Sequence, residues 1–257
     1  MSPLFSVIVC TYNRARLLLR ALSSLVHQQW QDWEAIVVDD GSTDATPLLL
    51  AAIAAEESRI HPFRIAHSGP GIARWYGIQR ARGHFITFLD SDDEYLCEHL
   101  AIRAQYVLDH PSADFLHGAV EVIGFPFVPD RNNPHRWIPI SECVVGGTFF
   151  VRRTLALQLG YPPLAFADDA AFYDRICRAG IQPIWMPFPT YRYYRTTADS
   201  LCTTYGHMFA QSSPHHGTIP ILPAAAGAGT ETHGGSAPPS ERGVPRGPHP
   251  APVSESL

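Results

Sequence analysis

Carboxylates gather at three places in this 257-residue chain, and their spacing points more directly to chemistry than any other feature. The sharpest group is Asp90-Ser91-Asp92-Asp93, where two carboxylates lie at i and i+2 with a third beside them. Grouped carboxylates suit Mg²⁺ or Mn²⁺, and an octahedral ion takes its remaining ligands from water and phosphates. The EF-hand pattern is absent, so we predict a cation site completed by a phosphate-bearing ligand. The alternative is a solvated acidic loop in which Asp92 or Asp93 caps a helix.

The second group is the run DDGSTD at residues 39–44. A turn explains Gly41, which would supply a positive φ, and Asp44, which would cap the next helix. It does not explain the adjacent carboxylates of Asp39 and Asp40, because like charges repel at a strand end. Their oxygens could accept hydrogen bonds from a base or a ribose, so the turn and the binding interpretation both stay open.

The third group is the pair Asp168-Asp169. Phe172 and Ile176 lie four residues apart and indicate the apolar face of a helix that Gly180 would end. Both carboxylates would then lie at the helix N-terminus, where the helix dipole favours negative charge. Capping accounts for one of them, and a second carboxylate next to an acceptor would serve as a general base.

Alternating strands and helices are predicted to position these groups. Apolar runs predict strands at 5–10, 34–38, 63–66 and 84–89, and helical spacing predicts helices at 14–27, 44–55 and 71–81. Right-handed crossovers between such strands imply an α/β fold with a mostly parallel sheet and helices on both faces. Ligands in such sheets bind beyond the carboxyl ends of the strands. The first two acidic groups follow the fourth and second strands there.

Composition limits the classes of partner. With 46% hydrophobic and 17% charged residues, the chain suits one globular domain. A net charge of -5 argues against a nucleic-acid partner, which would need a concentrated basic face. The five cysteines form no CxxC pair, which is typical of a reducing compartment. The 13 histidines lack the ligand spacing of a structural zinc site.

Two segments separate by composition. We predict a catalytic-type domain at 1–209 and a disordered, low-complexity tail rich in Pro, Gly and Ser at 210–257. No run approaches the roughly 18 apolar residues of a membrane span, and no secretion signal opens the chain. The sequence therefore predicts a cytoplasmic protein without a transmembrane span and leaves peripheral membrane contact open.

The absence of rival motifs narrows the choice within this fold class. Residues 10–15 read CTYNRA where a dehydrogenase would carry GxGxxG, and neither a Walker A loop nor a GxSxG elbow occurs. The chain instead resembles the inverting glycosyltransferases of family 2, with the GT-A (nucleotide-diphospho-sugar transferase, Rossmann-like) fold, over roughly residues 4–200. Six motifs in the family's order carry the resemblance: SVIVCTYNR, VVDDGSTD, HSGPGIARWYG, ITFLDSDD, VVGGTFFVRR and FADDAAFYDRICRAG.

The resemblance implies roles for individual residues on the nucleotide side. Cys10, Tyr12 and Asp40 stand where similar enzymes contact the base, with Asp40 accepting from a uracil-type N–H. Asp39 would support that loop. Arg74 stands where the family's arginine contacts or orders the diphosphate.

The resemblance also implies roles for the residues that would contact the metal, the sugar and the acceptor. Asp92 would be the principal ligand of Mg²⁺ or Mn²⁺, Asp90 would touch the ribose or the metal, and Asp169 would be the catalytic base. The candidates for contact with the sugar or acceptor are Gly146, Gly147 and Asp168. A metal held by Asp92 would neutralise the leaving diphosphate while Asp169 takes the proton of the attacking hydroxyl, which gives inversion.

This chain departs from the family's pattern at three positions. Trp75 follows the arginine where many relatives have Asn, Cys97 stands where a proline is frequent, and the acidic pair is Asp-Asp rather than Glu-Asp. The QxxRW motif of processive synthases is absent, which favours transfer of single sugars.

We therefore expect a metal-dependent, non-processive hexosyl-type transferase of polysaccharide-biosynthesis character. Its donor would be a nucleotide-sugar, with a UDP-sugar favoured because the family commonly uses UDP. Its acceptor would be a glycan, a lipid-linked hydroxyl or a small molecule. The alternatives are a non-catalytic or degenerate sugar-nucleotide-binding module and a nucleotidyltransferase, although the latter would need a glycine-rich loop after the first strand. A pure interaction domain would leave the three acidic groups unexplained.

Overall fold

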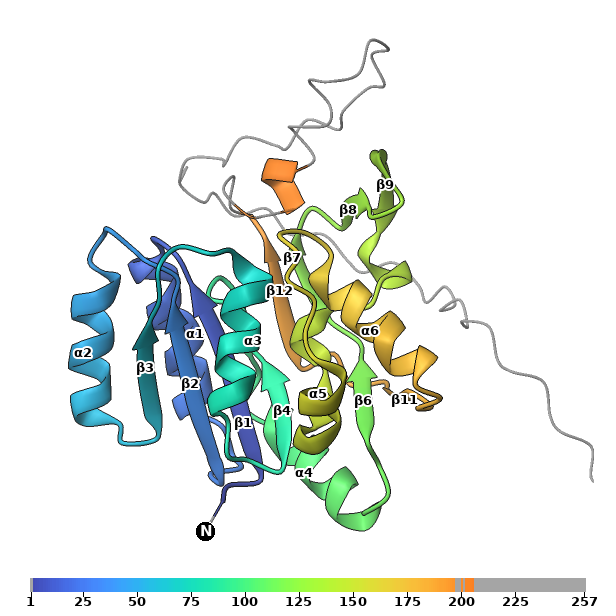
Figure 1. The fold of residues 1–257 in the computed structure, drawn as a ribbon, viewed down its shortest axis with the longest axis horizontal. Helices are drawn as coiled ribbons and strands as arrows, with labels where there is room; N and C mark the ends of the chain where they lie inside the picture. The colour runs from blue at the N-terminus through green and yellow to red at the C-terminus, as the bar shows by residue number, and fades with distance from the viewer. Residues whose placement is uncertain (1, 197–199, 201, 206–257) are drawn as a thin grey trace, which may run out of the picture. The chain divides into compact units, whose positions relative to one another are not determined.

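The computed structural model describes residues 2–196, 200 and 202–205, which include a central seven-stranded sheet (Figure 1). The strand order is β11-β6-β10-β4-β1-β2-β3. Its parallel part consists of β1 (Phe5–Thr11), β2 (Trp33–Asp39), β3 (Ile60–Arg64) and β4 (Phe85–Phe88), connected by α1 (Ala15–Val26), α2 (Thr46–Glu56) and α3 (Pro70–Arg80). The register pairs Phe5 with Trp33 and Thr11 with Asp39, so the carboxyl ends of β1 and β2 lie level.

The rest of the described chain completes the sheet and adds smaller elements. The order is β5 (Glu94–Tyr95), α4 (His99–Asp109), β6 (Phe115–Gly118), β7 (Glu121–Gly124), β8 (Phe127–Asp130), β9 (Asn133–Pro139), the 3₁₀ turns η1 (Ile140–Glu142) and η2 (Gly146–Thr148), β10 (Phe150–Arg152), α5 (Arg153–Leu159), α6 (Asp168–Arg178), β11 (Ile184–Met186) and β12 (Tyr191–Arg195). A second sheet has the order β5-β12-β7, and β8 and β9 form a two-stranded hairpin.

Hydrophobic side chains cover both faces of the central sheet. Alternate residues of β1 face opposite sides, so Val7 and Val9 join one buried cluster while Ile8 joins the other. The first cluster contains the buried face of α1, and the second contains the buried hydrophobic residues of α3 and α6. Because both faces are covered, the parallel strands need the near-continuous apolar runs seen in the sequence.

The predicted fold class, an α/β protein with a mostly parallel sheet, is confirmed. Two details differ from the prediction. The third strand begins at Ile60 instead of residue 63 and contains Pro62, which an edge strand tolerates because it pairs only with β2. In addition, β10 enters the sheet antiparallel between β4 and β6.

Two further sequence predictions concern the tail at 210–257 and the lack of a membrane-spanning segment. The predicted tail at 210–257 lies outside the described residues, and the division at residue 209 stays a prediction. Among the described residues, no helix has the length and apolar character that crossing a membrane requires.

A buried carboxylate ties the amino-terminal ends of β1 and β2 to the turn before β4. Glu34 is 2% exposed, and its Oε1 accepts hydrogen bonds from Ser6 Oγ and Arg82 N, both at 2.6 Å. Arg82 Nε donates to Glu34 Oε2 at 2.9 Å. Burial raises the pKa of the Glu34 carboxyl, but these hydrogen bonds outweigh it and the pKa lies below its ordinary value. Glu34 is therefore ionised in the folded protein.

We expect Glu34→Gln to lower the free energy of unfolding by about 2 kcal/mol at pH 7, because it weakens hydrogen bonds to a buried charge. A lowered pKa contributes stability above the unfolded-state pKa and loses it as pH falls through the folded-state pKa. The difference between variant and wild type should therefore shrink below about pH 4. Urea unfolding at both pH values measures it. Glu57→Gln, at the partly exposed pair with Arg59, is the control and should cost under about 1 kcal/mol. Equal losses in both variants would contradict the prediction.

Candidate active site

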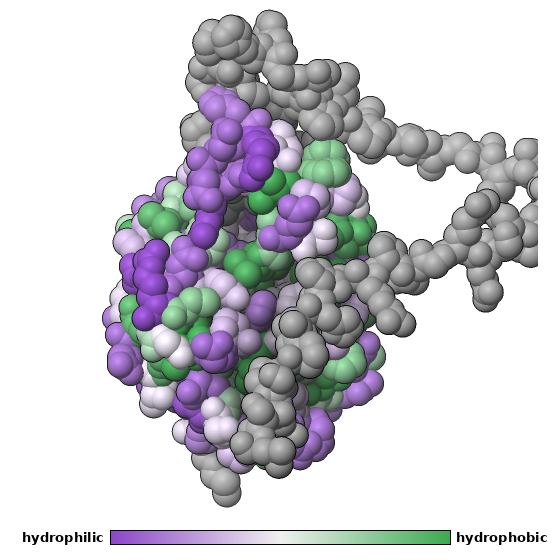
Figure 2. Space-filling view, turned by 90° about the vertical axis from the view of Figure 1, so that its right-hand side faces the viewer, coloured by the Kyte–Doolittle hydropathy of each residue, from purple (hydrophilic) through white to green (hydrophobic). Residues whose placement is uncertain are grey.

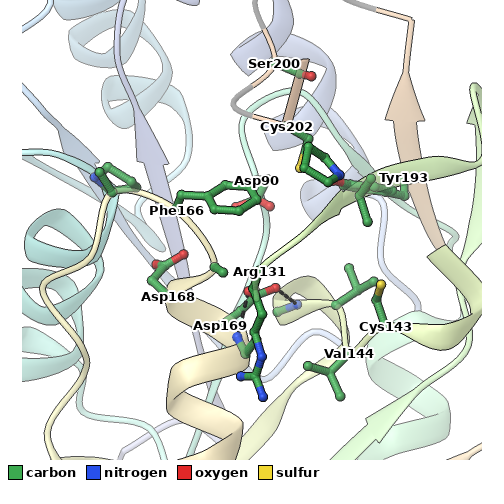
Figure 3. A pocket seen from close by; sticks show the side chains of 18 of the residues that line it. Asp90, Arg131, Cys143, Val144, Phe166, Asp168, Asp169, Tyr193, Ser200 and Cys202 are labelled. Atoms are coloured by element: carbon green, nitrogen blue, oxygen red, sulfur yellow. Dashed lines mark hydrogen bonds between the residues drawn. The ribbon is translucent and has the colours of Figure 1, made fainter. Parts of the chain in front are cut away.

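A cavity of about 860 Å³ lies beyond the carboxyl ends of β1, β2 and β4, and it contains side chains from all three acidic groups. The N-terminus of α6 and residues of the β8–β9 hairpin line its other side. Figure 3 shows Asp90, Asp168 and Asp169 turned toward the same space. The hairpin lies at the upper right of Figure 1. Figure 2 is viewed from that side and shows hydrophilic side chains gathered in the upper part of the described surface.

The loop after β2 is held by its own two aspartates. Asp39 Oδ1 accepts from Ser42 N at 2.9 Å, across the turn in which Gly41 has a φ of 81°. Asp40 accepts from the backbone N of Ser68 at 2.8 Å and of Gly69 at 2.9 Å. Asp39 thus supports the turn, and Asp40 joins it to the segment before α3. The prediction that Asp44 caps the next helix is wrong, because the N-cap of α2 is Ala45; Asp44 lies one residue earlier and accepts from Thr46 N through its Oδ1 at 3.0 Å.

An aromatic pair lines the cavity beside Asp40. The ring of Tyr12 stacks on the ring of His67 with centroids 4.0 Å apart, and both side chains are exposed. His67 Nδ1 lies 2.9 Å from Asp40 Oδ2. Cys10, at the end of β1, also lines the cavity, and burial raises the pKa of its thiol to about 12. His67 opens the motif HSGPGIARWYG, but its residue type alone does not predict this contact.

The loop after β4 directs its three carboxylates to different partners. Asp90 Oδ1 accepts from Arg74 Nη2 at 2.7 Å, and Asp92 Oδ2 lies 2.6 Å from Arg14 Nη1. Asp93 is 1% exposed and does not line the cavity, because its oxygens accept from Tyr191 Oη at 2.7 Å and from a backbone N of β12 at 2.8 Å. The next helix, α4, begins only at His99, so the alternative that Asp92 or Asp93 caps a helix is wrong.

Asp90 and Asp92 fit the prediction of a divalent-cation site in the chemistry of their oxygens. Burial raises the pKa of Asp92, with the charge of Arg14 acting against this and that of Asp90 adding to it. Carboxylates that repel each other in a sheltered cavity are suited to a cation between them. The described residues contain no cluster of three or more ligating side chains. A cation here would therefore need further oxygens from water or a bound phosphate.

Arg74 bridges two of the acidic groups. Its guanidinium donates to Asp90 through Nη2 and to Asp168 Oδ2 through Nη1. The Arg74 side chain is 13% exposed and that of Asp168 is 8% exposed, so this ion pair is sheltered. Arg74 lies on α3, within the helix that follows Gly69, and its position between two acidic loops would suit contact with a diphosphate.

Asp169 lies in the first turn of α6 and is partly buried. Its Oδ2 accepts from Gly146 N at 3.0 Å, the hydrogen bond drawn in Figure 3, and its Oδ1 from Ala170 N at 2.7 Å. Burial, and then the negative charge of Asp168, raises the pKa of Asp169 to about 6. A carboxylate with that pKa is a competent base near neutral pH.

The two glycines of η2 serve internal contacts. A Cβ on Gly146 would lie 2.9 Å from Asp169 Cβ, so this glycine lets the backbone approach the carboxylate. Gly147 is buried and does not line the cavity, and a Cβ there would lie 2.1 Å from the ring of Tyr191. Tyr191 Oη also accepts from Asp90 N at 3.3 Å. Tyr191, which sequence reasoning missed, therefore connects the loop after β4 to η2.

The family description "Glycosyl transferase family 2" matches residues 6–211. A Campylobacter jejuni protein, GalNAc(5)-diNAcBac-PP-undecaprenol beta-1,3-glucosyltransferase, is 39% identical over 105 residues, which are 40% of this chain and 34% of that protein. The chain spans less than half the length of the curated relatives it matches.

Solved structures share the fold. Staphylococcus aureus TarS in complex with UDP-GlcNAc aligns with a TM-score of 0.63 at 24% identity, over 78% of this chain and 60% of that one. The Pyrobaculum calidifontis mannosyltransferase PcManGT in complex with GDP-Man and Mn²⁺ aligns with a TM-score of 0.62 at 22% identity, over 86% of this chain and 66% of that one.

We expect Gly147→Ala to lower the free energy of unfolding by about 3 kcal/mol, because the added methyl overlaps the buried Tyr191 ring. In a Tyr191→Leu background the same substitution should cost less, since the smaller side chain makes room for the methyl. Denaturant unfolding of the two single variants and the double variant measures this coupling. Strictly additive losses would show that the two residues do not compete for space.

Proposed function

The chain belongs to glycosyl transferase family 2, and on this premise we propose that it moves a single hexosyl-type sugar from a nucleotide-diphosphate sugar to a hydroxyl acceptor. We further propose that the transfer depends on Mg²⁺ or Mn²⁺, inverts the anomeric centre and is non-processive. The observation that carries the proposal is the meeting of Asp90, Asp92 and Asp169 in one cavity, with the pKa of Asp169 raised to about 6.

The nucleotide end of the proposed donor site is the region of Cys10, Tyr12 and Asp40. Asp40 already accepts two backbone hydrogen bonds and lies beside His67 Nδ1. A carboxylate offers about four acceptor positions, which leaves room for one base N–H. The exposed ring of Tyr12 offers a face on which a base would stack. A UDP-sugar is the favoured donor, and the fold shared with the UDP-GlcNAc complex of TarS supports it.

The diphosphate would lie between Arg74 and the loop after β4. Asp92 and Asp90 would hold the divalent cation, which when bound neutralises the charge that develops on the leaving nucleoside diphosphate. Arg74 is positioned to order the diphosphate because Asp90 and Asp168 fix its guanidinium. The Mn²⁺ in the complex of the Pyrobaculum neighbour supports a metal of this kind.

Asp169 is the proposed catalytic base. The backbone N–H groups of Gly146 and Ala170 hold its carboxylate, and the η2 turn that carries Gly146 opens to the cavity. Above pH 6 the carboxylate is mostly ionised and can accept the proton of an acceptor hydroxyl as that oxygen attacks C1 of the sugar. Asp168 is paired with Arg74, so we assign it the role of positioning that arginine beside the sugar.

The acceptor side of the proposal is broader. Glycans, lipid-linked hydroxyls and small molecules all remain candidate acceptors, and the β8–β9 hairpin forms the wall they would meet. The cytoplasmic location, the lack of a nucleic-acid partner and peripheral membrane contact stay predictions from the sequence.

We expect Asp169→Asn to reduce sugar transfer by about a thousandfold, because the acceptor hydroxyl loses its base. UDP binding, measured by calorimetry in the presence of Mn²⁺, should change by less than about threefold, since the nucleotide lies away from this carboxylate. Transfer is measured as UDP release that requires both donor and acceptor. Folded wild-type protein that binds UDP but transfers no sugar to a broad acceptor panel would favour the non-catalytic binding module.

The pH profile offers a separate test of the base. The kcat/KM of the wild type should rise with pH through about 6, the pKa of Asp169. Asp168→Asn removes the negative charge that helps to raise this pKa, so the rising limb should shift to lower pH even if the maximal rate falls. Asp174→Asn removes a charge farther along α6 and should leave the limb in place. A rising limb at the same pH in all three proteins would exclude Asp169 as the group that titrates.

A further inference from the structure

The positively charged side chain of Arg14 pairs with Asp92, the carboxylate proposed as a ligand of the metal. Arg14 directly precedes α1 and lines the cavity, and its Nη1 lies 2.6 Å from Asp92 Oδ2. The two side chains are 15% and 12% exposed. A charge pair this sheltered is weakened little by salt and holds its geometry.

A second arginine of α1 holds the same loop by a different route. Arg20 donates to the backbone carbonyl of Asp92, and its guanidinium lies 3.6 Å from the ring centroid of Tyr194. Asp93 also anchors the loop through Tyr191 Oη. Contacts other than that of Arg14 therefore fix the backbone of the loop, and the pairing of Arg14 with Asp92 is to the side-chain carboxylate, at a residue that lines the cavity. This division of contacts points to a role for Arg14 toward a ligand.

The charges predict what that role is. Asp92 is paired with Arg14, whereas the guanidinium of Arg74 is shared between Asp90 and Asp168. A divalent cation arriving alone would meet the positive charge of Arg14 at the oxygen it must bind, which weakens its binding. A diphosphate supplies negative charge for both the divalent cation and Arg14. A guanidinium matches phosphate oxygens as well as it matches a carboxylate.

We propose that Arg14 couples the two ligands of the donor site: it holds Asp92 until a nucleoside diphosphate arrives with the divalent cation, and then pairs with the phosphate. The inference rests on the donor site assigned under the proposed function. Its consequence is that the cation alone binds weakly and that the cation and the diphosphate strengthen each other's binding. By linkage, each raises the affinity of the other by the same factor.

The test is the binding of Mn²⁺ and UDP, separately and together, to the full chain at pH 8. Free Mn²⁺ is followed by electron paramagnetic resonance and UDP by calorimetry. In Arg14→Gln, Mn²⁺ alone should bind about tenfold more tightly or better, because the competing charge is gone. UDP in saturating Mn²⁺ should bind about tenfold more weakly, because a phosphate contact is lost. The factor by which UDP raises Mn²⁺ affinity should fall accordingly.

Two further variants separate this role from a structural one. Arg16→Gln removes the same charge from an exposed position on α1 and should change none of these affinities. Arg14→Lys keeps a positive charge beside Asp92, so Mn²⁺ alone should again bind as weakly as it does to the wild type. If circular dichroism shows that Arg14→Gln fails to fold, Arg14→Lys carries the test through UDP: binding in saturating Mn²⁺ should weaken, because an ammonium lacks the bidentate match to phosphate, and unchanged UDP affinity or tighter binding of Mn²⁺ alone would overturn the inference.

The outcomes distinguish the inference from the function beneath it. If wild-type protein binds neither UDP nor Mn²⁺ with UDP, the proposed donor site is wrong. If the wild type binds both but Arg14→Gln binds Mn²⁺ alone no more tightly, Arg14 does not compete for Asp92 and only the inference is overturned. Weaker binding of Mn²⁺ alone to Arg14→Gln would likewise overturn it.

Discussion

The contact between Arg74 and its two aspartates is the constraint on which the rest of the site depends. Asp90 follows a strand in the parallel part of the sheet, and Asp168 begins a helix 78 positions later, yet one guanidinium contacts both. Removing either partner of such a sheltered pair would leave a charge without compensation, which costs far more than an exposed pair contributes. Arg74 thereby fixes the distance between the loop after β4 and the N-terminus of α6.

The placement of Asp169 follows from that contact. Because Asp168 is held by Arg74, the adjacent carboxylate is held in the cavity and meets the N–H of Gly146. Burial, and then the nearby negative charge of Asp168, raises the pKa of Asp169. A glycosyltransferase needs its base ionised near neutral pH yet basic enough to take a hydroxyl proton, and a pKa of about 6 meets both needs. The cluster of Arg74, Asp168 and Asp169 thus sets the ion pairing at the start of α6 and the proton affinity of Asp169.

Much of the fold and some of the site could be predicted from the sequence, because those parts depend on local patterns. The buried run of β1, the positive φ of Gly41 and the acidic start of α6 are all encoded by neighbouring residues. What escaped prediction depends on partners distant in the chain. The roles of Asp93 and Gly147 are set by Tyr191, which lies 98 and 44 positions farther on. Arg14 was read only as part of a motif, since its pairing with Asp92 requires the sheet to bring α1 and the loop after β4 together.

The contacts of Tyr191 have a consequence for how such a protein can evolve. The ring leaves no room for a side chain at Gly147, and the hydroxyl occupies Asp93, so a change at any of the three positions is tolerated only with compensating changes at the others. Residues under that mutual restriction accumulate substitutions slowly and together. The β8–β9 hairpin carries exposed polar side chains on the other wall of the cavity, and exposed ion pairs such as that of Arg131 with Asp174 restrict substitution less. Descendants of this chain could therefore change the hairpin wall of the cavity while they keep the packing of the loop after β4 against η2.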